Sequence, residues 1–485
     1  MLDEEEIEKI EAATLKLTPS QIVEALDKYV VGRAEAKKAI AIALRNRYRR
    51  RLVKDELKNE ISPKNILMIG STGVGKTELS RRIAKITQVP FLKVEATKFT
   101  EVGYVGRDVE SIVRDLVEIA ISEEKKFMLS SVEEEAKQKA EEKILDILLP
   151  IETTEDSNEN SGIPDFGTMS GMSQTSNLEQ RQLSEKEKNV REMFRKKLKS
   201  GELEERLIEI EISVKSSMPI NPIEIGFAPM NESQMDKLGG LFKNIMQSVS
   251  PKNKRKVKIK IARKILSSEI AESMIDLEKV ITKAIYKTEN MGIVFIDEID
   301  KVVSKGSSQG IDVSREGVQR DILPLVEGSS VNTKYGVVKT DHILFIAAGA
   351  FHISSPADII PELQGRFPIR VELEPLNVED LERILTEPKN ALMRQYHALL
   401  KTEGVELVLK KDAQSEIAEI AHHVNSTTDN IGARRLATIM EKLLEDILFE
   451  STSGKTEKKI VIDKAFVKDK LENIVKDKDL SRFIL

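Results

Sequence analysis

The 485-residue chain contains no cysteine. This absence excludes disulfides, thiolate zinc sites and cysteine nucleophiles, and it is typical of proteins from a reducing cytosol. The acidic residues 1–16 lack the basic and apolar regions of a signal peptide, and no apolar run is long enough to cross a bilayer. We therefore expect a cytoplasmic protein with no membrane partner.

A strong excess of one charge is also missing. The net charge is −5, with 32% charged and 40% hydrophobic residues, a profile typical of soluble globular proteins. One basic stretch, residues 251–264, has no interleaved aromatic residues, and its "VKIKI" (257–261) alternates like a strand. We interpret it as a solvated face rather than a nucleic-acid site, and expect no nucleic-acid partner.

Four short apolar runs predict buried parallel strands: residues 65–70, 90–96, 292–298 and 342–348. They are too short for buried helices and rich in β-branched residues. Helical patterns lie between them, as in Glu78 to Thr87. This alternation predicts an α/β layer architecture.

A long gap separates the second and third runs. An amphipathic pattern begins at Asp108, charged helical stretches continue to about Leu149, and helical patterning returns from about Leu183 to Ile212. Between them, a segment near 152–180 is rich in Ser, Asn, Gly and acidic residues and is predicted to be disordered or a mobile loop. We expect a largely helical module, residues 123–284, inserted into the α/β domain.

The C-terminal part has helical spacing. It is evident in "VEDLERILTEP", "SEIAEIAHHV" and "ARRLATIMEKLLEDILF", and a short apolar "KKIVID" predicts one strand. The expected division is an acidic extension (1–17), an α/β domain in two parts (18–122 and 285–372), the inserted module, and a small, mostly helical C-terminal domain (373–485).

The stretch "GSTGVGKT", residues 70–77, matches G-x-x-x-x-G-K-[ST] between a predicted strand and a predicted helix. Its glycines, Gly70, Gly73 and Gly75, let backbone N–H groups surround phosphate oxygens, and the helix N-terminus adds partial positive charge. Lys76 can reach the β and γ phosphates, and Thr77 can bind Mg²⁺. The motif predicts a site for ATP with Mg²⁺.

A second motif, "GIVFIDEIDK" (292–301), ends a strand with Asp297 and Glu298. A carboxylate at that strand end can hold Mg²⁺ through water. Glu298 can orient and deprotonate an attacking water, so the pair predicts hydrolysis rather than binding alone.

Together with "GYVG" (103–106), "VSREGVQRDILPLVEG" (313–328), "PELQGRFPIRVEL" (361–373) and "NIGARRL" (430–436), these motifs resemble the AAA+ unfoldases of the Clp/Hsp100 group. The resemblance extends from about Leu17 to Leu485 and is weaker in the inserted module. It implies an α/β fold with an AAA+ P-loop NTPase core, a parallel sheet between helices. It also implies a homohexameric ring that uses ATP to unfold proteins and thread them into a partner peptidase ring.

The resemblance also implies roles for single residues. Val31 contacts the adenine, Glu362 belongs to the nucleotide site near a subunit boundary, and Arg366 is an arginine finger offered to the neighbouring subunit. Arg434, chosen over Arg435 from the family's spacing, is a sensor arginine for the γ-phosphate. The phosphates are held by Gly73, Val74, Gly75, Lys76, Thr77 and Glu78. No sensor is assigned on strand 342–348, where Ala347, Ala348 and Gly349 are small.

In this family the residues Gly103, Tyr104, Val105 and Gly106 line the axial pore and grip unfolded or tagged protein substrates. Taken alone, the tetrapeptide also fits an ordinary turn with Tyr104 packed on its own domain. The tail "DLSRFIL" (479–485) resembles a segment that docks on the peptidase ring, although a frayed terminus has the same pattern.

Two other functions use the same core. A nucleic-acid motor would need a basic pore or a stacking platform, which the charge and "GYVG" do not favour. A standalone chaperone would need no peptidase and no docking tail.

Overall fold

The computed structural model describes residues 17–53, 56–61, 63–100, 107–149, 185–212, 253–303, 311–451 and 459–476. They divide into two compact units, one from 1–125 with 277–485 and one from 126–276. Within the described ranges no helix is both long and apolar enough to span a membrane. Three predicted features lie outside them: the segment near 152–180, the tail 479–485, and the tetrapeptide of Gly103, Tyr104, Val105 and Gly106.

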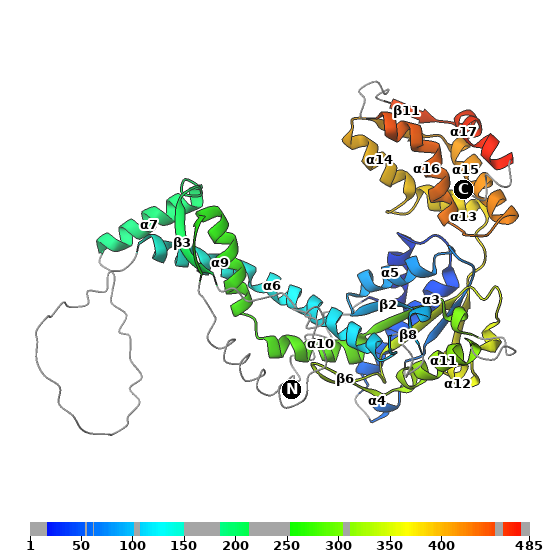
Figure 1. The fold of residues 1–485 in the computed structure, drawn as a ribbon, viewed down its shortest axis with the longest axis horizontal. Coiled ribbons are helices and arrows are strands. Elements are labelled where there is room, and N and C mark those ends of the chain that lie inside the picture. Colours follow the sequence, from blue (N-terminus) through cyan, green and yellow to red (C-terminus); the bar gives the residue numbers. More distant parts are fainter. Residues whose placement is uncertain are drawn as a thin grey trace, which may run out of the picture. The chain divides into compact units, whose positions relative to one another are not determined.

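The first unit is built on a five-stranded parallel sheet with strand order β2-β5-β8-β1-β9. Figure 1 labels β2 and β8 of this sheet. The strands are β1 (Ile66–Ile69), β2 (Phe91–Glu95), β5 (Ile293–Asp297), β8 (Leu344–Gly349) and β9 (Ile369–Glu372). The four predicted strands are confirmed. The fifth, β9, was not predicted because only two of its four residues are apolar, and its burial is that of an edge strand.

Successive residues of the central strands enter two separate cores. On one face, Leu67, Val294 and Phe345 pack with residues of three helices: α6 (Ser111–Leu148), α11 (Ile311–Glu327) and α12 (Pro361–Arg366). On the other face, Met68 and Phe295 pack with α2 (Pro19–Asp27), α3 (Ala34–Arg51) and α5 (Lys76–Thr87). Because both faces are covered, the strands read as continuous apolar runs, which is why they could be predicted.

Shorter elements complete this α/β part. They are α4 (Leu57–Glu60), α10 (Leu277–Met291), the 3₁₀ turns η1 (Ala96–Lys98), η2 (Ile299–Val302) and η3 (Pro356–Asp358), and an antiparallel hairpin of β6 (Ser330–Thr333) and β7 (Gly336–Lys339). The hairpin was not predicted. Its four-residue strands carry few apolar residues, and only Val331 and Val338 are buried.

The C-terminal part has its own core of 20 buried residues, among them Leu381, Ile417 and Leu443. Its elements are α13 (Val378–Thr386), α14 (Leu392–Thr402), β10 (Glu406–Leu409), α15 (Lys411–Thr427), α16 (Arg434–Glu450), β11 (Lys459–Ile462) and α17 (Lys464–Lys476). The predicted helices and the strand β11 are confirmed, and β11 pairs in parallel with β10.

The second unit contains the C-terminal part of α6, α7 (Glu185–Ser200), β3 (Leu207–Ile212), β4 (Asn253–Lys258) and α9 (Ile259–Ser273). Two predictions here are wrong in part. The helical pattern expected up to Ile212 ends at Ser200, because "LIEIEI" alternates with period two and forms β3. The strand expected over 257–261 ends at Lys258, because Ile259, Ala262 and Leu266 bury one face of a helix.

His342, which lies just before β8, should make the stability of the fold depend on pH. Burial lowers the pKa of His342 to about 4; the adjacent Arg50 and Arg47 act in the same direction, and Asp341 opposes them. In the unfolded chain the histidine has its ordinary pKa near 6.5. Between pH 6.5 and 4 it is therefore mostly protonated in the unfolded chain and mostly neutral in the folded chain. The stabilisation is complete above about pH 6.5 and is lost as the pH falls toward 4.

We expect the free energy of unfolding to fall by on the order of 2 kcal/mol over that window, after allowance for solvent screening. Urea denaturation at pH 7.5 and pH 5 measures the larger part of this fall. A His342→Gln variant should show a smaller difference between the two pH values, whereas the exposed His422→Gln should behave like the parent chain. Equal pH differences in all three proteins would contradict the assignment.

Candidate active site: a nucleotide pocket at the sheet edge

Three strands, β1, β5 and β8, end side by side at the carboxyl end of the sheet. The loop 70–75 follows β1, Asp297 ends β5, and residues 350–352 follow β8. The register sets Ile69 of β1 beside Gly349 of β8, so these ends are level. In open parallel sheets, ligands bind in the crevice outside the carboxyl ends of the strands.

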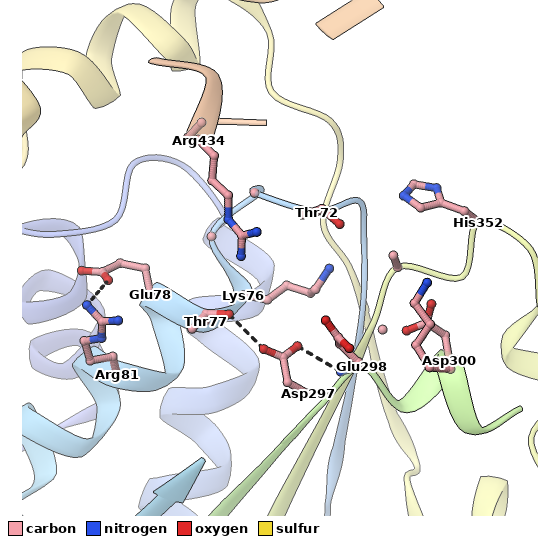
Figure 2. A pocket seen from close by; sticks show the side chains of 16 residues that line it. Thr72, Lys76, Thr77, Glu78, Arg81, Asp297, Glu298, Asp300, His352 and Arg434 are labelled. Atoms are coloured by element: carbon pink, nitrogen blue, oxygen red, sulfur yellow. Dashed lines mark hydrogen bonds and ion pairs between the residues drawn. The ribbon is translucent and has the colours of Figure 1, made fainter. Parts of the chain in front are cut away.

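A cavity of about 440 Å³ lies at this carboxyl end of the sheet, and its volume is within the range of small-molecule sites. Figure 2 shows that the side chains around it come from α5, from the end of β5, from the loop after β8 and from the start of α16. Eight predicted site residues line it: Gly73, Gly75, Lys76, Thr77, Glu78, Asp297, Glu298 and Arg434. Eight others were not assigned from the sequence: Thr72, Arg81, Asp300, Lys301, Gly349, Ala350, His352 and Ala433.

The phosphate-binding loop folds around a buried lysine. Lys76 is only 8% exposed, and its ammonium donates to the carbonyl oxygens of Gly70 and Ser71, the latter at 3.0 Å. Gly73 and Gly75 have φ of 77° and 104°, the left-handed conformations that let the loop turn into α5. Burial lowers the pKa of Lys76, and the charge of Arg434 adds to this effect, while Asp297 and Asp300 oppose it.

The loop holds two further signs of an anion site. The hydroxyl of Ser71 is buried and finds no hydrogen-bond partner among the described residues. The first residues of α5, Lys76, Thr77 and Glu78, line the cavity, so the positive end of the helix and its free N–H groups lie beside it. Polar groups that lack internal partners are what a polyphosphate would satisfy.

Thr77 and Asp297 bring their oxygens together. The Thr77 hydroxyl donates to Asp297 Oδ2 at 3.1 Å, and Lys93 from β2 lies 2.8 Å from the same oxygen. A hydroxyl and a carboxylate beside a phosphate loop are the donor set typical of Mg²⁺. Among the described residues, no group of three or more acidic or histidine side chains could hold a metal by itself.

Glu298 has a strained backbone. Its φ of 56° lies in the left-handed region, which costs a non-glycine residue about 1–3 kcal/mol and is concentrated at functional sites. Its N–H donates to Asp297 Oδ1 at 3.1 Å, and the carboxylate is exposed to the cavity beside Asp297 (Figure 2). An acceptor in this position can take a proton from a water that attacks a bound phosphate.

The far wall comes from the loop after β8. Phe351 has φ of 51°, and its N–H donates to Asp300 Oδ2 at 3.3 Å, while Ser354 Oγ donates to the Asp300 carbonyl oxygen at 3.3 Å. These bonds fix the loop that carries His352 to the cavity (Figure 2). Asp300 belongs to the motif 292–301 but was not assigned a role, and His352 lies in no quoted motif, because the two residues meet only through the tertiary fold.

Val31 and Val74 do not line the cavity. Both are buried, at 7% and 3% exposure, and they lie on neighbouring loops. The two loops are joined by Arg33, whose Nε donates to the Val74 carbonyl oxygen at 3.2 Å. The segment of Val31 therefore lies against the phosphate loop. Arg33 itself was not assigned from the sequence.

Glu362 and Arg366 lie on α12, outside the cavity, with exposed side chains. Arg366 forms an ion pair with Glu327 at 2.8 Å, and the two side chains are 50% and 38% exposed. Such surface pairs contribute only about 0–1 kcal/mol, so the guanidinium can be released at small cost. The Arg366 main chain is held by Asn65, which donates to its carbonyl oxygen at 3.1 Å.

The two adjacent arginines at the start of α16 point to different surroundings. Arg434 lines the cavity and extends toward the phosphate loop (Figure 2). Arg435 is 4% exposed and donates hydrogen bonds to Asn425, Thr428 and Asp429 of the C-terminal part.

Family models match three parts of the chain. Residues 66–161 match "ATPase family associated with various cellular activities (AAA)", residues 220–370 match "AAA domain (Cdc48 subfamily)", and residues 376–462 match "C-terminal, D2-small domain, of ClpB protein". Curated relatives match nearly the whole chain. "ATP-dependent protease ATPase subunit HslU" of Bacillus cereus is 52% identical over 473 residues, 97% of this chain and 100% of the relative. The protein of the same name from Persephonella marina is 51% identical over 469 residues, 97% and 99% of the two chains.

The chain belongs to the HslU family. The predicted AAA+ core and the resemblance to the Clp/Hsp100 group are thereby confirmed. Membership of the HslU family and the matches to the AAA models show that the chain is an ATPase that binds ATP. The phosphate loop at the carboxyl end of the sheet agrees with this activity.

Because Glu298 lines the pocket of this HslU-family chain, we predict that its substitution slows ATP hydrolysis without weakening ATP binding. Glu298→Gln keeps the shape of the side chain but removes the base, so ATP turnover should fall by about 10²–10⁴-fold. Binding of a fluorescent ATP analogue should change little. The exposed Glu118→Gln, whose parent residue pairs with Lys334 away from the cavity, is the control. Turnover at the parent rate in Glu298→Gln would remove this residue from the chemistry.

Proposed function

We propose that the chain is the ATPase subunit of an ATP-dependent protease, and that it unfolds protein substrates and threads them into a separate peptidase ring of the HslV type. The observation that carries this proposal is the 52% identity with HslU over 97% of the chain. The pocket with its phosphate loop, carboxylate pair and arginine supports it. Neither a nucleic-acid motor nor a standalone chaperone is favoured by these findings.

The charges of the pocket suit phosphoryl transfer to water. Lys76, the N-terminus of α5 and Arg434 offer positive charge to the phosphates of ATP, where negative charge grows in the transition state. Glu298 would orient the attacking water and take its proton. Mg²⁺, when bound, neutralises phosphate charge, and the Thr77 hydroxyl and Asp297 carboxylate are the groups that would hold it with the nucleotide.

Hydrolysis would need a neighbouring subunit. Arg366 and Glu362 lie four residues apart on α12, away from the cavity of their own chain, and the Arg366 side chain forms an exposed ion pair with Glu327. In a homohexameric ring, Arg366 would serve as an arginine finger in the pocket of the next subunit. Val31 would contact the adenine next to the phosphate loop.

The tetrapeptide of Gly103, Tyr104, Val105 and Gly106 would grip the substrate in the ring's axial pore. The residues that flank it are joined: Phe99 and Arg107 form a β-bridge, and the Thr100 N–H donates to the Arg107 carbonyl oxygen at 3.4 Å. Upstream lies β2, whose Lys93 contacts Asp297 of the pocket. A change at the phosphates would thus have a short route to the loop, through the ion pair between Asp297 and Lys93 and then along the chain from β2.

The remaining assignments belong to the same proposal. The tail 479–485 would dock on the peptidase ring, and the chain would act in the cytoplasm without a nucleic-acid or membrane partner. Residues 123–284 would form the inserted module, and the compact unit 126–276 supports such a boundary. The α/β parts would be 18–122 and 285–372, followed by the small domain 373–485.

The tail gives a direct test of the peptidase partnership. The purified chain, an HslV-type peptidase and ATP should together degrade a folded reporter protein. Deletion of residues 482–485 should abolish activation of the peptidase while basal ATP hydrolysis remains, because none of these residues is assigned a role in binding or hydrolysing ATP. Full activation by the truncated chain would contradict docking through the tail. Stimulation of ATP hydrolysis by single-stranded DNA but not by unfolded casein would favour a nucleic-acid motor instead.

The pore assignment is tested at Tyr104. We expect Tyr104→Ala to hydrolyse ATP at about the parent basal rate yet lose degradation of the folded reporter, because only the gripping side chain is shortened. Tyr104→Phe keeps the aromatic ring and should degrade the reporter. Equal degradation by the alanine and phenylalanine variants would remove Tyr104 from the mechanism.

A further inference from the structure

The turn 428–433, which joins α15 to α16, lies directly on the phosphate loop. The Ala433 N–H donates to the Gly73 carbonyl oxygen at 3.1 Å. A Cβ atom added to Gly73 would overlap the carbonyl oxygen of Ile431, and one added to Gly432 would lie 2.7 Å from the Gly73 carbonyl carbon and 2.8 Å from the Thr72 carbonyl oxygen. The two backbones are therefore in contact with no room for a side chain between them.

A hydrogen-bond network behind the turn holds its shape. Arg435 donates from Nε to Asn425 Oδ1 at 3.3 Å, and from Nη2 to Thr428 Oγ1 at 3.1 Å and the Asp429 carbonyl oxygen at 2.7 Å. Asn425 also donates to the Gly432 carbonyl oxygen at 3.1 Å and accepts from the Ile431 N–H at 3.3 Å. Arg435 and Asn425 are 4% and 8% exposed, so few water molecules can replace these bonds.

The network and the pocket are linked through the first residues of α16. Adjacent helical residues point about 100° apart. Arg434 therefore reaches the cavity while Arg435 turns into the C-terminal part, where it lines no pocket wall. Any shift of the turn moves the Cα of Arg434 and the contact on Gly73 together.

We propose that Arg435 is a positioning residue: with Asn425 it holds the turn 428–433 on the phosphate loop and so fixes Arg434 at the phosphates of ATP. This inference rests on the proposed role of Arg434 in hydrolysis. Arg435 itself touches neither the nucleotide nor the reacting atoms. Its effect on the reaction passes through the turn.

The main experiment compares steady-state ATP hydrolysis of the full-length parent and of Arg435→Met. Methionine keeps much of the buried volume but makes none of the three side-chain hydrogen bonds. We expect the KM for ATP to rise about tenfold, with a fall in kcat as well, because a charge-assisted contact with the phosphates is no longer held in place. Arg435→Lys retains one charged donor and should recover part of the KM.

A matched control separates positioning from simple destabilisation. Arg47 is also buried, at 9% exposure, and donates to the carbonyl oxygens of Met291, Asn290 and His342, away from the cavity. Arg47→Met should lower the Tm, as Arg435→Met does, but leave the KM for ATP within about twofold of the parent value. An unchanged KM in Arg435→Met, or an equal rise in both variants, overturns the proposal.

A double-mutant cycle tests whether Arg435 acts through Arg434. If it does, Arg435→Met should change kcat/KM much less in an Arg434→Ala background than in the parent. Fully additive effects overturn the positioning role while leaving Arg434 in the mechanism. A parent-like Arg434→Ala variant would overturn both assignments, so the two failures can be told apart.

Two glycines provide a test that leaves Arg435 intact. Gly432 and Gly404 both have positive φ, 60° and 77°, but a Cβ atom meets the phosphate loop only at Gly432 and open space at Gly404. Both alanine variants carry backbone strain. Gly432→Ala should raise the KM for ATP about tenfold or more, and Gly404→Ala should not. An unchanged KM in Gly432→Ala counts against the docked turn.

Discussion

The rest of the site depends on the hydrogen bonds that the buried Lys76 ammonium makes with the phosphate loop. A charge removed from water is costly unless it is paired or hydrogen-bonded, and here the carbonyl oxygens of Gly70 and Ser71 accept from it. These neutral acceptors satisfy the lysine but do not neutralise it. The loop therefore keeps a positive charge in a partly desolvated place, where a polyphosphate is a stronger partner than a carbonyl oxygen.

The surrounding residues keep that charge usable. Burial lowers the pKa of Lys76, and the negative charges of Asp297 and Asp300 oppose that shift and favour the ammonium form. Asp297 is in turn occupied by Thr77, Lys93 and the Glu298 N–H, which hold its two oxygens in fixed directions. Glu298, by contrast, has a strained backbone and an exposed carboxylate, as expected of the proposed group that would act on a water molecule.

Much of the α/β core could be predicted from the sequence because each central strand is buried on both faces and is apolar throughout. The same reasoning missed β9 and the β6–β7 hairpin, whose strands are short and only partly buried. It also extended a helix through β3, whose six residues alternate with period two but follow closely on the charged helix α7. Short amphipathic strands carry too few residues to separate the two periods.

The candidate site also has a part that could be predicted and a part that could not. Local motifs located Lys76, Thr77, Asp297 and Glu298 in the pocket, because each lies in a short stretch that ends or follows a strand. Asp300 and Arg33 contact residues from distant parts of the chain, and His352 reaches the pocket only through the tertiary fold, so no local pattern gave these residues a role. Arg435 contacts a turn only 6 to 10 residues before it, but the motif that contains it does not indicate that contact. The resemblance to a known family, rather than any pattern of spacing, distinguished Arg434 from Arg435.

Asn65 gives the architecture one more property. Its Oδ1 accepts from the Phe345 N–H of β8 at 2.9 Å, its Nδ2 donates to the Arg366 carbonyl oxygen, and it immediately precedes β1, which carries the phosphate loop. One amide thus ties the start of β1, whose other end carries the phosphate loop, to β8 and to the backbone of Arg366. A displacement of β1 would therefore be transmitted to the C-terminal end of α12 through a single side chain.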